Sequence, residues 1–67
     1  MCEANIYLDI KNGEEPTLFL EAADTVVPEG ENVWRITSIF GEQKTIHGKI
    51  QSMRLVEHRI VFETLEP

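Results

Sequence analysis

The sequence Val-Trp-Arg-Ile-Thr-Ser-Ile-Phe at residues 33–40 decides the fold. Branched or aromatic side chains occupy six of its eight positions, a composition typical of β-strands. Alternation places Trp34, Ile36 and Phe40 on one face of the strand and Ile39 on the other. Because both faces carry apolar residues, we predict a central strand, or a strand whose outer face meets another subunit.

Strand patterns continue towards the C-terminus. A turn at 41–42 leads into a predicted strand at 43–47, and Gly48 then interrupts what would otherwise be a continuous strand. An isolated glycine in this position usually marks a bulge or a sharp coil of the sheet. Residues 49–55 form the next β-prone stretch, and the alternation within 59–63 predicts the last strand.

Strand patterns also precede the central run. Residues 3–10 alternate apolar and polar side chains with a period of two, which predicts a half-buried strand. Asn12-Gly13 favours a tight reversal, and a second strand is expected at 16–20. Residues 21–24 are too short for a helix, so we interpret them as a bend or bulge before another short strand. The Pro- and Gly-containing stretch 28–32 predicts a turn.

Five or six short strands without a helix of three turns predict an all-β fold. The strand lengths and turn spacing suggest a small antiparallel barrel of SH3-like size, with residues 1–67 as a single domain and 64–67 as a loose tail. A chain of 67 residues is close to the lower limit for an independent hydrophobic core. A homodimer would relieve that shortage.

Charge is distributed unevenly along the chain. Residues 1–31 carry eight acids and one lysine, residues 32–67 carry four acids and five bases, and the formal net charge is −6. Nucleic-acid binders draw most of their non-specific affinity from neutralising phosphates, which an acidic surface repels. We therefore predict that nucleic acid is not a partner and that cations are tolerated.

Compartment and chemistry are constrained by what the sequence lacks. A single cysteine cannot form an intramolecular disulfide and suits a reducing compartment. No signal-peptide pattern and no membrane-length apolar stretch occurs, so we expect a soluble, cytoplasmic protein. Phosphate-loop, serine-hydrolase, zinc-protease and Cys-x-x-Cys motifs are also missing. A small barrel has its interior filled by side chains, so we predict that the protein is not an enzyme.

Met1 and Cys2 supply an unusual set of donor atoms. Cys2 is the only cysteine and lies one peptide bond from the α-amine. Its thiolate, its backbone nitrogen and the Met1 amine can close two adjacent five-membered rings around one metal ion. Such a planar, nitrogen-rich set favours Ni(II) or Cu(II) over tetrahedral Zn(II). The alternatives are a cysteine without a role and a redox-reactive thiol.

Three donors leave one position on the metal open. The candidates for the fourth donor are the thiolate of Cys2 of the partner subunit, His47 and His58. Neither histidine lies in a metal-ligand spacing, so each by itself is more simply a surface residue. A symmetric dimer that brings two N-termini together needs neither histidine.

Four blocks of the sequence carry a family resemblance: Met-Cys-Glu-Ala-Asn at 1–5, Pro-Glu-Gly at 28–30, Ile-Phe-Gly-Glu-Gln-Lys at 39–44 and Val-Glu-His-Arg-Ile-Val-Phe-Glu at 56–63. They resemble the CooT-like proteins, small nickel-binding accessory factors associated with carbon monoxide dehydrogenase maturation. The resemblance covers essentially the whole chain. It implies a small β-barrel homodimer that binds Ni(II) through Cys2.

The leading hypothesis is a cytoplasmic, nickel-binding homodimer with Met1 and Cys2 as metal ligands. It would deliver nickel or maintain its level, and the resemblance implies carbon monoxide dehydrogenase as one client. The alternative hypothesis is a small β-barrel adaptor that binds RNA or a protein partner.

Overall fold

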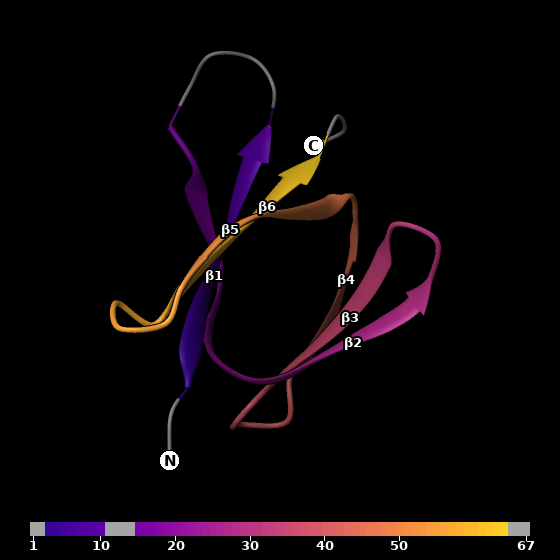
Figure 1. Ribbon diagram of the computed structural model, residues 1–67. Helices are drawn as coiled ribbons and strands as arrows, with labels where there is room; N and C mark the ends of the chain where they lie inside the picture. The colour runs from indigo at the N-terminus through magenta and orange to yellow at the C-terminus, as the bar shows by residue number, and fades with distance from the viewer. Residues whose placement is uncertain (1–2, 11–14, 65–67) are drawn as a thin grey trace.

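The computed structural model describes residues 3–10 and 15–64, and its regular structure within these ranges consists of β-strands (Figure 1). These strands form one sheet in the order β4-β3-β2-β1-β6-β5. The all-β prediction is therefore confirmed. The strand bounds are β1 Ala4–Ile10, β2 Thr17–Gly30, β3 Val33–Ser38, β4 Gln43–His47, β5 Lys49–Arg54 and β6 Arg59–Thr64.

Strand β1 lies inside the sheet, between β2 and β6. It pairs antiparallel with β2 and parallel with β6, whereas the pairs β2–β3, β3–β4 and β5–β6 are antiparallel. The prediction of an antiparallel sheet is therefore wrong at β1–β6. The reason is the β5–β6 hairpin, which returns the chain beside β1 in the direction of β1 itself.

Strand β2 is continuous, where the sequence predicted two short strands separated by a bend. Its first part pairs with β1 and its second part with β3, and Ala23 lies opposite both Ala4 and Ser38. Ala22 has a φ of 56°, and the β2–β3 register shifts just after Ala23. The bulge predicted within 21–24 is thus confirmed, and it lets one strand bend from one partner to the next.

Strand β3 ends at Ser38, two residues before the end of the predicted run 33–40. The Ser38 hydroxyl oxygen accepts hydrogen bonds from the backbone N–H groups of Phe40 (3.1 Å) and Glu42 (3.2 Å), which closes a turn instead of extending the strand. Phe40 was predicted to share a face with Ile36. Ile36 is fully buried, but Phe40 is 80% exposed, so that prediction is wrong for Phe40.

Two other element boundaries also differ between the prediction and the structure. The turn predicted at 28–32 is narrower, because β2 continues to Gly30 and only Glu31 and Asn32 form the turn. Thr64, predicted to begin a loose tail, is instead buried at the end of β6. The predicted Asn12-Gly13 reversal lies outside the described residues.

The hydrophobic core covers one face of the sheet. Trp34 of β3 packs edge-on against Phe62 of β6, with ring centroids 5.7 Å apart, so the core joins strands that are not neighbours in the sheet. The inward face predicted for 3–10 is confirmed at Ile6, which is fully buried. The buried members of the core cluster are Ile6, Leu20, Ala23, Ile36, Ile46, Ile60 and Phe62.

Gly48 alone joins β4 to β5, the two edge strands of the sheet. One residue spans at most about 3.6 Å, so the sheet must curl until its edges approach each other. Figure 1 shows this curl, and β4 also contacts β6. Within the described ranges no hydrogen-bonded pairing joins β4 to β5. The curled sheet therefore remains open, in contrast to the closed SH3-like barrel that the sequence suggested.

The backbone of Gly48 is held on both sides. Its N–H donates to the Asn32 carbonyl at 2.8 Å, and its carbonyl accepts from the Trp34 indole Nε1 at 3.0 Å. A Cβ atom at position 48 would overlap the Glu63 backbone carbonyl. Only glycine fits this corner without moving the backbone of β6.

We predict that Gly48→Ala lowers the free energy of unfolding by about 1–3 kcal/mol, because the added methyl group forces β6 away from the corner. Gly30→Ala is the matched control, since a Cβ there meets no atom within 4 Å. Urea denaturation of both variants measures the difference. Equal stability of the two variants would contradict the proposed close approach.

Candidate functional site

Met1 and Cys2, the predicted metal ligands, lie outside the described residues. The first described residue is Glu3, immediately before β1. What the structure describes is therefore the surroundings of Glu3, built from the start of β1, the bulge of β2 and the β5–β6 turn.

Asn5 fastens the start of β1 to both neighbouring segments. Its backbone N–H donates to the His58 carbonyl at 2.7 Å, which ties the β5–β6 turn to β1. Its side-chain Oδ1 accepts from the Ala22 N–H at 3.2 Å, which ties the bulge of β2 to the same strand. This second contact satisfies the backbone of a non-glycine residue in the left-handed region. Asn5 thus holds the β5–β6 turn and the β2 bulge in place beside Glu3.

Two hollows open around Glu3, and both include Glu3 and His58. The first has a volume of about 510 Å³ and is lined by Glu3, Asn5, Glu21, Ala22, Glu57 and His58. The second has a volume of about 300 Å³ and is lined by the apolar residues Ala4, Ala23, Val26, Leu55 and Ile60 together with Glu3, Asp24, His58 and Arg59. Glu3 therefore borders both an acidic hollow and a largely apolar one.

The charge around these hollows is predominantly negative. Glu3, Glu21, Asp24 and Glu57 are all exposed, and none of them has an ion pair with another described residue. Among the described residues that line the two hollows, the one Lys or Arg is Arg59, whose guanidinium stacks over the Tyr7 ring at 4.2 Å. Clustered acids of this kind raise the local concentration of cations.

The two histidines lie at opposite ends of β1. His58 precedes Arg59, and Arg59 is paired with Asn5 near the start of β1. His47 precedes Gly48, which packs against Glu63 and so lies near the end of β1. Of the two histidines that the sequence offered as the fourth donor, the structure brings only His58 next to Glu3.

The described residues alone do not assemble a metal site. Within 3–10 and 15–64, no group of three or more His, Cys, Asp or Glu side chains is arranged to hold an ion. In the same ranges, no helix is long and apolar enough to cross a membrane.

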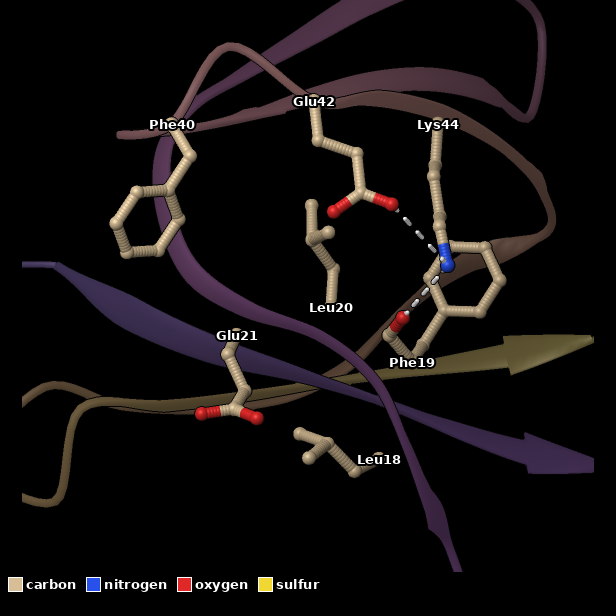
Figure 2. Close-up of a pocket in the computed structure, with 7 residues that line it drawn as sticks. All are labelled: Leu18, Phe19, Leu20, Glu21, Phe40, Glu42 and Lys44. Carbon is tan, nitrogen blue, oxygen red and sulfur yellow. Dashed lines mark hydrogen bonds and ion pairs between the residues drawn. The ribbon is translucent and has the colours of Figure 1, made fainter.

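A separate groove of about 350 Å³ lies between β2 and the β3–β4 turn (Figure 2). Lys44 is held on one side of it: its ammonium donates to the Phe19 carbonyl at 3.2 Å, lies 4.8 Å from the centre of the Phe19 ring and pairs with Glu42 at 3.9 Å. Phe40 stands at the opposite side with its ring exposed. The groove thus has an exposed aromatic ring on one side and a partly exposed ion pair on the other, a combination that suits contact with another protein.

Comparison with known proteins decides the family. The family described as CO dehydrogenase accessory protein CooT matches residues 1–63. The chain belongs to the CooT family. The resemblance inferred from the sequence is confirmed, and the family is one of accessory proteins for CO dehydrogenase.

A solved structure of a CooT relative has the same fold. The crystal structure of a candidate CooT from Carboxydothermus hydrogenoformans is 38% identical in sequence, with a TM-score of 0.82 over 97% of this chain and 100% of that one. A search of the curated proteins finds no match.

Sequence reasoning missed the residues that surround Glu3. The alternation within 3–10 does not distinguish Asn5 from the other polar residues of its strand, and no pattern connects Glu21, Ala22 or Glu57 with the start of the chain. No local pattern marks these contacts, because they depend on β6 running parallel to β1. The one feature of the sequence that pointed to an acidic surface there was the excess of acids in residues 1–31.

We predict that Asn5→Ala lowers the free energy of unfolding by about 1 kcal/mol, because it removes the acceptor of the Ala22 N–H. Asn5→Asp is the control, since it keeps an acceptor oxygen in place. Urea denaturation in high salt, which screens repulsion from Glu21, makes the comparison. A loss of equal size in both variants would show that the Asn5–Ala22 contact does not stabilise the bulge.

Proposed function

We propose that this CooT-family chain is a cytoplasmic accessory protein that binds Ni(II) through Met1 and Cys2 as a homodimer. The ligands are the Cys2 thiolate, the Cys2 backbone nitrogen and the Met1 amine. The observation that carries the proposal is a Met-Cys start that immediately precedes Glu3, in a chain matched from residue 1 by a family of CO dehydrogenase accessory proteins.

The chemistry of the donor set supports nickel as the cargo. Thiolate and nitrogen donors in one plane suit Ni(II), and the bound ion displaces the thiol proton. The exposed acids around Glu3 favour the approach of a cation. One chelate of this kind suits transfer of an ion to a client better than storage, and CO dehydrogenase is the client that the family description favours.

Exposed apolar side chains beside the same end of the chain support the homodimer. Leu55 is 70% exposed and Val56 93% exposed, and both belong to the β5–β6 turn that carries His58. A symmetric contact through this turn would cover them and bring two N-terminal segments together.

We expect Cys2→Ser to abolish stoichiometric Ni(II) binding in protein with a free N-terminus, because the thiolate is the charged donor of the chelate. Titration followed by the thiolate-to-nickel charge-transfer absorption tests this, and native mass spectrometry gives the number of ions per dimer. An N-terminal tag should also weaken binding, since it converts the amine into an amide.

The matched control is Cys2→Ser/Thr45→Cys, which returns an exposed thiol on β4 without an adjacent amine. It should not restore the absorption band. Stoichiometric binding by Cys2→Ser with wild-type affinity would overturn the proposed nickel site.

A second candidate function is protein recognition through the groove of Figure 2. The specific observation is Phe40, since exposed aromatic residues are enriched where proteins meet. This supports the protein-partner form of the adaptor hypothesis, and it is compatible with nickel binding because Phe40 does not line the hollows beside Glu3.

We expect Phe40→Ser to weaken association with purified CO dehydrogenase by about tenfold or more while leaving Ni(II) affinity unchanged. Ile39→Ser is the matched control, because Ile39 is half-exposed beside Phe40 but does not line the groove. Surface plasmon resonance measures both. Association unaffected by Phe40→Ser would remove the groove as a contact for this client.

A further inference from the structure

We propose that residues 18–21 of β2 form an open sheet edge that pairs with an extended, lysine- or arginine-containing segment of a partner protein. This inference rests on the protein-recognition function proposed for the groove of Figure 2, and it names the form and the chemistry of the bound segment. It is independent of the proposed nickel site.

The first part of β2 has a strand neighbour on one side only. β1 pairs with it there, with Ile6 opposite Leu20. β3 lies on the other side of β2, but its pairing with β2 extends only as far as Ala23. In the part of the chain that the structure describes, no strand therefore pairs with residues 18–21 on the side away from β1. An open edge of this kind is a template for another strand.

The groove lies where a longer β3 would have paired with β2. The Ile39 N–H still donates to the Ala22 carbonyl at 2.9 Å, but the Ser38 hydroxyl then closes the turn that takes the chain away from β2. Phe40 and Lys44 of the following segment line the groove together with β2 (Figure 2). Its volume of about 350 Å³ is thus space beside an unpaired strand edge.

The Phe19 carbonyl faces this space and needs a hydrogen-bond donor. Within a sheet, such a carbonyl usually accepts from the backbone N–H of a neighbouring strand. Here it accepts from the Lys44 ammonium at 3.2 Å, so a side chain substitutes for the missing strand. Because the Lys44 side chain is partly exposed, it can move aside when a backbone N–H of an incoming segment takes the same carbonyl. Strand addition to an open edge supplies main-chain hydrogen bonds of this kind.

The charge and the apolar surface of the groove define the segment that fits. Among the described residues that line it, Glu21 and Glu42 stand against Lys44, a balance of −1. Lys44 is paired with Glu42, whereas Glu21 has no ion pair with another described residue. Phe40 and the half-exposed Leu18 supply apolar contacts. A segment that alternates apolar and cationic residues complements both features, and an acidic segment does not.

The test uses the full-length, isotope-labelled protein and the peptide Val-Lys-Val-Lys-Val-Lys-Val, blocked at both ends, as the probe. We expect peptide-dependent NMR shifts and slower amide hydrogen exchange within residues 18–21. In an extended peptide, the N–H groups of the valines and those of the lysines point to opposite edges. N-methylation of one set should therefore weaken binding by about tenfold or more, whereas methylation of the other set should leave it unchanged.

Two further comparisons test the charge. Replacing the lysines of the peptide by glutamates should weaken binding by about tenfold or more. In the protein, Glu21→Gln should weaken binding of the lysine peptide by about threefold or more. Glu31→Gln is the matched control, because it removes the same charge from the β2–β3 turn and does not line the groove. It should bind the lysine peptide like the wild type.

Several outcomes would overturn the inference: no binding of the lysine peptide, shifts outside the groove, equal binding of the two N-methylated peptides, equal binding of the lysine and glutamate peptides, or equal affinities of Glu21→Gln and Glu31→Gln. Slow exchange within residues 18–21 of the free protein that is lost on dilution would also overturn it, because a second copy would then occupy the edge. If Phe40→Ser weakens association with CO dehydrogenase but the peptide does not pair, only this inference fails. An association unaffected by Phe40→Ser refutes the function proposed for the groove.

Discussion

The close packing of Gly48 against the Glu63 carbonyl is the constraint on which the rest of the structure depends. Gly48 joins the two edge strands, so the backbone must turn from one edge of the sheet to the other within one residue. That is possible only if the sheet curls, and the bulge at Ala22 supplies part of the bend in β2. The curl in turn lets Trp34 meet Phe62 and encloses a core in a chain close to the lower size limit.

The same curl organises the start of the chain. Because β5 and β6 form a hairpin that returns beside β1, the β5–β6 turn comes to lie next to Glu3. Asn5 then connects this turn and the β2 bulge to β1 through one backbone and one side-chain hydrogen bond. In the proposed function, the chelating atoms come from Met1 and Cys2, and the fold gathers exposed acids beside Glu3, the residue that follows them in the sequence.

The two surfaces with functional potential are neighbours. Glu21 of β2 lines both the acidic hollow beside Glu3 and the groove that carries Phe40. A client protein that contacts the groove would therefore lie close to the hollow beside Glu3. This arrangement fits an accessory protein of CO dehydrogenase, because adjacent parts of one strand, β2, belong to both surfaces.

The sequence by itself determined the all-β class, most strand positions, the bulge within 21–24, the importance of Gly48 and the CooT family, because alternation, turn residues and family blocks are local signals. It also singled out Met1 and Cys2, whose chelating geometry needs no fold. Only the tertiary structure decided that β6 runs parallel to β1, that the curled sheet stays open, that Ser38 turns Phe40 outwards, and that His58 rather than His47 lies beside Glu3. These features depend on contacts between residues far apart in the chain, which no local pattern encodes.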